Sequence, residues 1–214
     1  GHGRSPGPRG DPPSYDALLN DVGLPLTAAA RRYAKVPRFL YGHSTGGNLV
    51  LNYCLRRTTQ LTGVIASSPW LRLAFAPPAW KERLGRLLLR IRPGATFAMG
   101  LDPADLSHDG EVAAAYARDR LVHGRVSARL YFGILDGAAY ALEHADEFRL
   151  PLLLMQGSAD PIVDAEATRE FAEQVRGRCN LLLWDGLFHE LQNEVEREEV
   201  FEALWHWIEE RRST

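Results

Sequence analysis

The sequence predicts an α/β fold, in which a mostly parallel sheet is flanked by helices and interrupted by an inserted helical cap. Short apolar runs alternate with amphipathic helical patterns near both ends of the chain, as in parallel strands joined by helices. One apolar run leads directly into a Gly-x-Ser-x-Gly pentapeptide and a helical pattern. Residues 69–147 instead contain helical patterns separated by Pro and Gly. We therefore expect a core of residues 1–68 and 148–214, and a cap, or lid, of residues 69–147.

The composition excludes several classes of protein. The 214 residues fit one domain, and the net charge of -2 gives no sign of a nucleic-acid partner. The two cysteines exclude a disulfide scaffold and suit a reducing compartment. No apolar run approaches the ~18 residues of a membrane span, and the first residues do not have a signal-peptide pattern. We expect a cytoplasmic protein, and peripheral association with a membrane is a further option.

The chain before the pentapeptide predicts a loop and an interrupted helix. Residues 1–13 are turn formers and predict a loop or a disordered tail. A helix is expected over residues 14–21, with Ser14 as its N-cap. Pro25 follows Gly23 and would interrupt this helix, because proline removes a backbone hydrogen bond. The helix is then expected to restart over residues 27–34.

Four strands and three further helices are expected in the core. The strands are predicted at residues 38–41, 63–67, 151–157 and 180–184. One helix follows the pentapeptide and a second covers residues 165–176. The last helix is expected to bury one face that carries Val200, Phe201, Leu204, Trp205 and Ile208.

The predicted cap contains three helical regions. The first is amphipathic and basic, and its apolar face carries Trp80, Leu84, Leu87, Leu88 and Ile91. The others are expected at residues 112–120 and 129–147. The basic side chains of the first region suit either a solvated surface or contact with an anionic lipid surface.

The pentapeptide Gly42-His43-Ser44-Thr45-Gly46 predicts a nucleophile elbow, because it stands between a strand and a helix. The chain reverses so sharply here that the serine backbone is strained, and glycine on either side leaves room for the strand and helix. Ser44 would then present its Oγ at the carboxyl end of the sheet. The Thr45 N–H, at a helix N-terminus, would be one oxyanion donor. The alternative is a glycine-rich turn with an incidental serine.

Two further candidates each follow a predicted strand. They are Asp160 and His189, and with Ser44 they occur in the order that is typical of α/β-hydrolases. In this hypothesis Ser44 attacks an ester carbonyl, His189 moves the proton to the leaving alcohol, and Asp160 orients the imidazole. Taken alone, Asp160 would be a turn former. The nearby Asp164 is expected to cap the next helix.

Neither a metal nor a cofactor is expected. His43, beside the serine, is interpreted as structural. Five other histidines show no metal-ligand spacing: His2, His108, His123, His144 and His206. The sequence has no Walker loop and no Gly-x-Gly-x-x-Gly pattern, so a phosphate cradle is not expected.

Four stretches carry a family resemblance. They are Gly1-His2-Gly3-Arg4-Ser5, Gly42-His43-Ser44-Thr45-Gly46-Gly47, Gln156-Gly157-Ser158-Ala159-Asp160-Pro161-Ile162-Val163, and His189-Glu190 with Asn193-Glu194. As a set they resemble the monoacylglycerol lipase and lysophospholipase branch of the α/β-hydrolases. The resemblance implies a serine esterase that acts on monoacylglycerols, lysophospholipids or other single-chain esters without a cofactor. It also implies that residues 69–147 form a lid whose apolar face lines an acyl channel and makes transient contact with membranes.

The chain departs from this family in two ways. The predicted break at Gly23 and Pro25 falls where the family has a continuous helix. In the family, the Gly-His-Gly-Arg-Ser stretch follows the fourth of eight strands, so the resemblance implies that the N-terminal half of the sheet is absent from this chain. The absent part would carry the second oxyanion donor, whose loss typically costs about 10²–10³ in rate. We expect a separate N-terminal chain, or a second copy in a homodimer, to cover the open strand edge at Phe39-Leu40-Tyr41.

Two other functions stay open at this point. One is a catalytically silent or truncated α/β-hydrolase-like domain that binds a lipid without turning it over. The other is a serine peptidase of the same fold, although no charged pocket for a free amine is visible in the sequence. An epoxide hydrolase is disfavoured, because that reaction on this fold calls for a carboxylate nucleophile.

Overall fold

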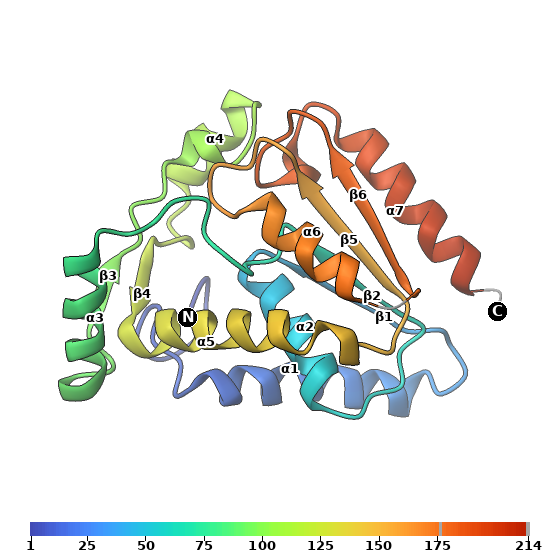
Figure 1. Ribbon diagram of the computed structural model, residues 1–214, viewed down its shortest axis with the longest axis horizontal. Helices are drawn as coiled ribbons and strands as arrows, with labels where there is room; N and C mark the ends of the chain where they lie inside the picture. The colour runs from blue at the N-terminus through green and yellow to red at the C-terminus, as the bar shows by residue number, and fades with distance from the viewer. Residues whose placement is uncertain (176, 213–214) are drawn as a thin grey trace.

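The computed structural model describes residues 1–175 and 177–212, and in this part of the chain four parallel strands form the central sheet (Figure 1). The order is β1-β2-β5-β6, with every neighbouring pair parallel. The strands are β1 (Phe39–His43), β2 (Gly63–Ser67), β5 (Leu152–Gly157) and β6 (Cys179–Trp184). Because all four run in the same direction, the loops that follow them meet at the carboxyl end of the sheet.

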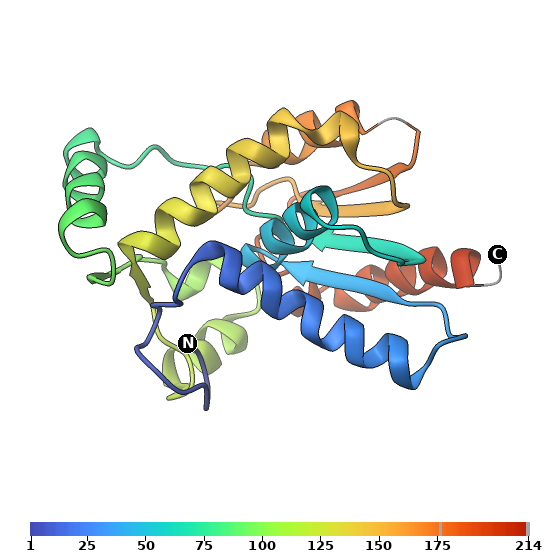
Figure 2. The ribbon, with the colours of Figure 1, turned by 90° about the horizontal axis from the view of Figure 1, so that it is seen from below.

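Helices cover both faces of the sheet, which confirms the predicted α/β architecture. On one face lies α7 (Arg197–Arg212), whose Val200 and Trp207 pack with Ile65 and Met155 of the sheet. On the other face α2 (Thr45–Arg56) and α6 (Ala165–Gln174) pack in a second apolar cluster. Figure 2 shows α7 on the opposite side of the strands from α1 and α2. This double cover explains why β2 and β5 are buried along their whole length.

The first helix is continuous, so the predicted interruption is wrong. Helix α1 spans Tyr15–Arg32 with Pro25 inside it, and Ser14 caps its start as expected by accepting from the Ala17 N–H. Leu19 is fully buried, and Gly23 lies against Tyr53 of α2. Pro25 itself is exposed, so water can satisfy the carbonyl that loses its hydrogen bond. Tertiary packing therefore outweighs the local cost of proline.

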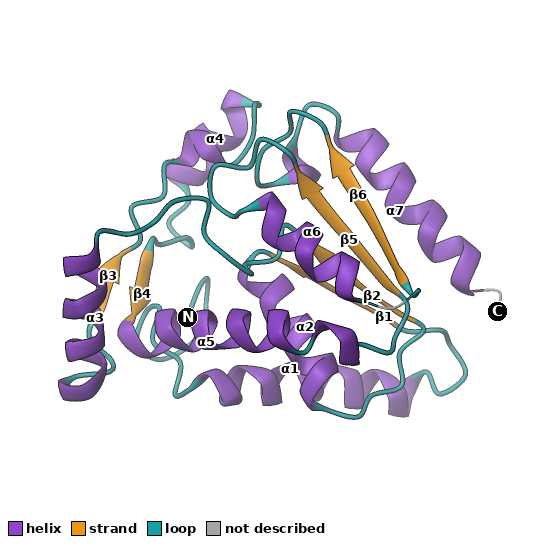
Figure 3. Ribbon diagram, viewed as in Figure 1, coloured by secondary structure: helices purple, strands orange, loops and turns teal. Residues whose placement is uncertain are grey.

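Part of the predicted cap forms a separate layer beyond the carboxyl ends of the strands. It contains α3 (Ala79–Ile91), a 3-10 turn (Pro103–Asp105) and α4 (Gly110–Arg118). It also contains a two-stranded antiparallel ribbon of β3 (Thr96–Ala98) and β4 (Arg125–Ser127), which the sequence did not predict. Figure 3 shows this ribbon beside α3 and apart from the main sheet. Its three-residue strands are too short to produce a recognisable alternation.

Helix α5 (Ala128–Glu143) shows a different packing from the rest of residues 69–147. It packs closely against α2, and its Ala141 belongs to the apolar cluster under the sheet. A 3-10 turn (Ala145–Glu147) and Phe148 continue this contact. The predicted cap boundaries stay a prediction, and the packing favours a shorter cap that ends near residue 127.

The segment before α1 is a loop, and it lies against the cap. The Gly3 N–H donates to the Leu121 carbonyl at 2.9 Å, and the Ser127 N–H donates to the Gly10 carbonyl at 2.8 Å. Asp11 pairs with Arg129 at 2.8 Å. These contacts hold a turn-rich segment in place without regular structure.

The last helix buries part of the predicted face, because Val200, Leu204 and Ile208 pack in the core, but Phe201 and Trp205 do not. Phe201 and Trp205 are 45% and 58% exposed, whereas Val200 and Trp207 are buried. The indole N–H of Trp207 donates to Asn180 Oδ1 at 3.1 Å, which rotates the helix toward β6. The predicted end of the preceding helix at Arg176, and the last two residues of the predicted core, lie outside the described residues.

Strand β1 lies at one edge of the sheet, and Tyr41 at its centre is 45% exposed. The expected pairing of this edge with another chain or a second copy stays a prediction. In the described part of the chain, none of the helices combines the length and the apolar character that a membrane crossing needs.

Candidate active site

Ser44 stands at the sharp turn between β1 and α2. Its backbone has φ 55° and ψ -118°, a left-handed conformation that costs a non-glycine residue free energy. A Cβ atom on Gly42 would overlap the carbonyl of Gly46, so only glycine permits this close return of the chain. The local sequence therefore produces the strained strand-turn-helix geometry expected of a nucleophile elbow.

His189 and Asp160 reach the same place from the loops after β6 and β5. The Ser44 Oγ lies 2.9 Å from His189 Nε2, and His189 Nδ1 lies 2.8 Å from Asp160 Oδ2. The His189 residue is 4% exposed and the Asp160 residue 7%. The three residues that the sequence singled out thus form one continuous hydrogen-bonded chain, in which Asp160 and His189 are buried and Ser44 is half-buried.

Both carboxylate oxygens of Asp160 accept hydrogen bonds. Oδ1 accepts from the N–H groups of Ile162 and Val163 at 2.9 and 3.0 Å. Oδ2 accepts from His189 and also from the Gln156 amide, at 2.9 Å. Because the carboxylate only accepts, His189 carries its proton on Nδ1 and offers Nε2 to the Ser44 hydroxyl.

The backbone around His189 is held on both sides. The Ser68 hydroxyl donates to the His189 carbonyl at 2.7 Å, and Ser68 itself has a positive φ of 42°. The Glu190 N–H donates to the Leu106 carbonyl at 2.7 Å, which ties the loop to the segment before α4. A Cβ on Gly157 would overlap the carbonyls of Leu187 and Phe188, so glycine lets the loop before His189 pack on β5.

Glu194 is a fully buried carboxylate that joins the histidine loop to the cap. It accepts from the Phe188 N–H at 2.7 Å, from the His108 N–H at 2.9 Å and from the Ser107 hydroxyl at 3.2 Å. His108 Nδ1 lies 3.0 Å from it. Burial alone would raise the pKa of Glu194, but the bonds from Phe188 and His108 outweigh burial and lower it. In the sequence this residue stands out only as part of the family motif, and nothing local reveals these long-range partners.

His43 lies beside the catalytic candidates without bonding to them. Its ring centroid is 4.8 Å from that of His189. Burial, followed by the neighbouring His189, lowers the pKa of His43 to about 3. This ring is therefore neutral at ordinary pH and adds no charge to the site, which agrees with its expected structural place.

Thr45 is the first residue of α2, directly after Ser44. The first N–H groups of a helix have no partner within the helix, so the Thr45 N–H is free of that ladder. Its use as an oxyanion donor stays a prediction. Asp164, the other aspartate near this loop, caps α6 as expected and pairs with Arg72 at 2.7 Å.

The structure gives no sign of a metal centre in the part of the chain that it describes. No group of three or more His, Cys, Asp or Glu side chains there is arranged to hold an ion. Nothing in the site therefore suggests ligands for a metal.

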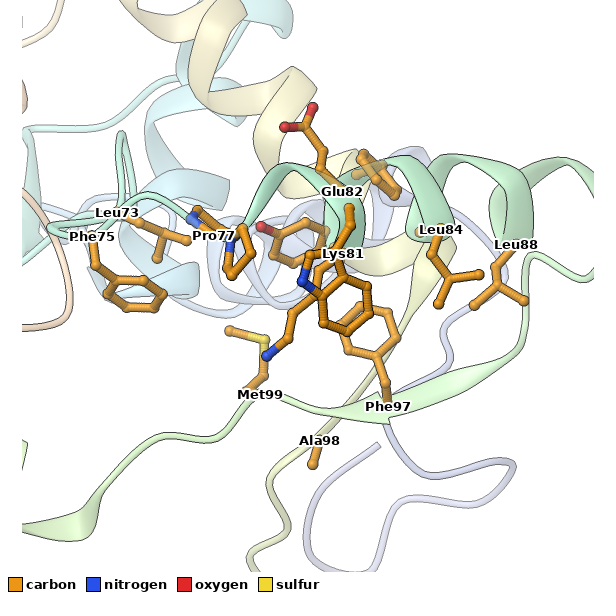
Figure 4. A pocket seen from close by; sticks show the side chains of 15 residues that line it. Leu73, Phe75, Pro77, Lys81, Glu82, Leu84, Leu88, Phe97, Ala98 and Met99 are labelled. Atoms are coloured by element: carbon orange, nitrogen blue, oxygen red, sulfur yellow. The ribbon is translucent and has the colours of Figure 1, made fainter.

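An apolar cavity of about 330 Å³ lies within the cap, between α3, β3 and α5. Leu84 and Leu88 of α3 point toward Phe97 of β3 (Figure 4). The lining residues are Leu73, Phe75, Pro77, Pro78, Trp80, Lys81, Glu82, Leu84, Gly85, Leu88, Phe97, Ala98, Met99, Tyr131 and Phe132. This is the size of a small-ligand site, and its lining is predominantly hydrophobic.

The cavity is linked to Ser44 through aromatic side chains, although Ser44, Asp160 and His189 do not line it. The backbone N–H of Trp70 donates to the Ser44 carbonyl at 3.0 Å. The Trp70 ring meets the lining residue Tyr131 edge to face, with centroids 6.1 Å apart. Trp70 therefore packs between the nucleophile turn and the wall of the cavity.

A family model described as "Serine aminopeptidase, S33" matches residues 1–196 of the chain. The chain is 34% identical, over 99% of its length, to an uncharacterized abhydrolase domain-containing protein of Dictyostelium discoideum, of which it spans 22%. It is 31% identical, over 95% of its length, to phospholipase YtpA of Bacillus subtilis, of which it spans 79%.

A solved structure has the same fold. The crystal structure of Paleococcus ferrophilus monoacylglycerol lipase superimposes with a TM-score of 0.88 and 32% identity. The match covers 96% of this chain and 79% of that one. The four-stranded sheet, its helices and the cap therefore correspond to a large part of an α/β-hydrolase.

Proposed function

Since the chain belongs to the serine aminopeptidase S33 family of α/β-hydrolases, we propose that it is a serine carboxylic-ester hydrolase of the monoacylglycerol lipase or lysophospholipase type. The observation that carries this proposal is the hydrogen-bonded chain from Asp160 through His189 to Ser44, at 2.8 and 2.9 Å. These distances suit a histidine base that takes the serine proton and a carboxylate that orients this base. The strained elbow supports the nucleophile role of Ser44.

The proposed reaction proceeds through an acyl-enzyme. The Ser44 Oγ attacks the ester carbonyl while its proton moves to His189 Nε2. Asp160 stabilises the imidazolium that forms, and the Thr45 N–H stabilises the negative charge on the carbonyl oxygen. His189 then gives the proton to the leaving alcohol. In the second half, a water loses its proton to His189 and releases the fatty acid from Ser44.

The proposed substrate is a lipid ester with one acyl chain. The apolar cavity suits an acyl chain, and Trp70 packs between its lining residue Tyr131 and the turn that carries Ser44. Helix α3 supports uptake from a membrane surface, because it exposes Trp80, Leu87 and Ile91 among basic residues. We therefore propose transient contact between the cap and lipid aggregates.

A peptidase of the same fold is the alternative that the family description favours. An aminopeptidase would need an acidic group to hold the free amine of its substrate. Glu82 lines the cavity, but it pairs with Arg86 at 2.9 Å, which argues against that use. A silent lipid-binding domain is the remaining alternative, and it would keep the cavity without turnover.

A fluorophosphonate probe distinguishes these functions when it is combined with substrate assays. We expect a single covalent adduct by intact-protein mass spectrometry, and hydrolysis of p-nitrophenyl esters and of monoacylglycerol. Ser44→Ala should lose the adduct and about 10⁵-fold or more of the turnover. The exposed Ser5→Ala is the matched control and should keep both.

Two results would contradict the proposal. An aminoacyl p-nitroanilide that is cleaved faster than the esters would favour the peptidase. Bound fatty acid without an adduct or turnover would favour the silent domain.

A further inference from the structure

Gln156 is a fully buried amide close to the start of the Asp160 loop. It is the fifth residue of β5 and has no exposed surface. Its Nε2 donates to Asp160 Oδ2 at 2.9 Å, and His189 Nδ1 bonds to that same oxygen at 2.8 Å. Two donors from different strand ends thus share one carboxylate oxygen.

Thr168 of α6 bonds to the other end of this amide and holds it in place. Its hydroxyl donates to Gln156 Oε1 at 3.0 Å, and Thr168 is also fully buried. The carboxylate can only accept, so the amide must present its NH₂ group to Asp160. Its oxygen then faces Thr168, where it meets a donor. Both ends of the amide are satisfied in this orientation, whereas a flip would set the amide oxygen against the carboxylate oxygen of Asp160.

We infer that Gln156, oriented by Thr168, is a positioning residue that holds the Asp160 carboxylate for His189. This inference rests on the proposed function, because it gives Asp160 the part of orienting the base. Both residues bond to the Asp160 side of the site, and neither is among the residues that line the cavity. Their effect must therefore pass through Asp160 and His189.

The shared oxygen leads to a specific electrostatic expectation. Each N–H donor stabilises the ionised carboxylate and partly neutralises its charge. Without the Gln156 donor, Asp160 attracts the imidazolium form of His189 more strongly, because less of its charge is compensated. The acid limb of kcat/KM, which reports the protonation of the free base, then moves to higher pH. Asp160 Oδ2 also gains freedom to move, so kcat falls.

Other titratable groups around His189 do not confuse this measurement. His43 of β1 faces the ring, but burial lowers its pKa to about 3, so it stays neutral through the assay range. On the histidine's own loop, Glu190 bonds to Asn193 at 2.6 Å and Glu194 bonds to Phe188 and His108. Substitutions at Gln156 and Thr168 leave all of these groups in place.

The test compares pH profiles of ester hydrolysis, with active sites counted by the fluorophosphonate probe. Gln156→Met removes the donor at nearly constant volume, and Gln156→Met/Thr168→Val also removes the hydroxyl that would be left unpaired. We expect the acid limb to rise by roughly half a pH unit to one unit. We also expect kcat per active site to fall roughly 3- to 30-fold. KM should change by less than about twofold, because neither residue contacts the substrate.

Two single variants at Thr168 complete the design. Thr168→Ser keeps the hydroxyl and is the matched control. Its acid limb of kcat/KM should lie at the same pH as that of the unaltered protein. Thr168→Val is isosteric and should fold even where Gln156→Met does not. It releases the amide, so its limb should move in the same direction by a smaller amount.

The outcomes separate the inference from the proposed function. One result would overturn the inference. It is an acid limb of kcat/KM that coincides with the control in Gln156→Met, in the double variant and in Thr168→Val, at unchanged kcat per active site. A loss of folded protein alone lowers the count of active sites and leaves the limb in place, so it would overturn the inference too. A lack of Ser44-dependent turnover in the unaltered protein would instead overturn the proposed function.

Discussion

Helices α2 and α3 have similar lengths and both are amphipathic, yet they use their apolar faces differently. Helix α2 buries five residues, including Asn48 and Asn52, and it starts at the nucleophile. Helix α3 buries only Gly85, and it leaves Trp80 63% and Ile91 73% exposed. One helix is enclosed by the protein, whereas the other presents its apolar side to the outside.

The polar groups of α2 fix its position through buried hydrogen bonds. Asn48 donates to the Trp70 carbonyl at 2.8 Å and accepts from the Tyr15 hydroxyl at 2.6 Å. Asn52 donates to the Gly137 carbonyl of α5 at 2.9 Å. These bonds tie the helix behind Ser44 to α1 and α5. Buried amides with partners at both ends specify one arrangement, which is what a catalytic geometry needs.

Helix α3 depends on a different kind of contact. Its Arg86 bonds to Glu82 one turn earlier, so this pair stays within the helix itself. Its contact with the remainder of the chain is apolar, through the cavity and Phe132. The difference between the two helices teaches that the helix behind Ser44 is held by satisfied polar contacts, whereas α3 is held mainly by apolar contacts.

The largest expected effect comes from the polar region, at Asp160. Asp160→Asn keeps the shape but offers an N–H to His189, which favours the wrong tautomer. We expect kcat for ester hydrolysis to fall about 10⁴-fold. Asp164→Asn, at the cap of α6, is the matched control and should keep activity within about twofold. Equal activity of the two variants would show that Asp160 is only a turn former.

Glu194 is expected to affect stability and its dependence on pH. Glu194→Gln replaces an acceptor of four bonds by an amide, and we expect the free energy of unfolding in urea at pH 7 to fall by about 1–3 kcal/mol. The folded pKa of Glu194 is lowered, so its stabilisation is present above the unfolded pKa of about 4.3 and is lost as pH falls through the folded value. The difference between the two proteins should therefore shrink in acid.

The exposed Glu196→Gln is the control for this measurement, since it should leave the unfolding free energy within about 0.5 kcal/mol. A difference between Glu194→Gln and the unaltered protein that persisted undiminished down to pH 3 would contradict a role for the ionised carboxylate.

The smallest expected effect comes from the outer face of α3. Leu87 and Ile91 are 51% and 73% exposed and do not line the cavity. Leu87→Ser/Ile91→Ser should lower hydrolysis of monoacylglycerol in lipid vesicles roughly 3- to 30-fold, because it removes the apolar surface that we propose for lipid contact. Hydrolysis of a short water-soluble ester should not change, and the unfolding free energy should stay within about 0.5 kcal/mol.

A cavity variant provides the matched comparison for that result. Leu88→Phe enlarges a side chain that points toward Phe97 across the cavity, and it leaves Leu87 and Ile91 on the outer face of α3 in place. It should discriminate against long acyl chains in vesicles and in detergent alike. If both variants, or neither, lost activity only on vesicles, the outer face of α3 and the cavity would not have the separate roles proposed for them.

Much of the active site could be predicted from local sequence, for a physical reason. In a parallel sheet, polar residues directly after a strand meet at one edge, so Ser44, Asp160 and His189 needed only correct strands. The helix caps at Ser14 and Asp164 were equally local, since each bonds to a backbone N–H two or three residues later.

The failures occurred where distant contacts decide between local alternatives. Pro25 signals a break, but burial of Leu19 and the fit of Gly23 against Tyr53 keep α1 continuous. Helix α7 carries two overlapping apolar stripes, and the Trp207–Asn180 bond helps to choose between them. The ribbon of β3 and β4 pairs segments that are far apart in the chain and too short to show a pattern.

The sequence by itself determined the strands, the nucleophile turn and the three residues at the strand ends, because periodicity and backbone sterics act over a few neighbouring residues. Only the tertiary structure decided what surrounds them. Thr168 looks ordinary in the sequence, and Gln156 and Glu194 stand out there only as parts of the family motifs. The contacts of all three follow from partners that folding brings within about 3 Å. Burial then makes those contacts matter, since an unpaired polar group away from water costs far more than one at the surface.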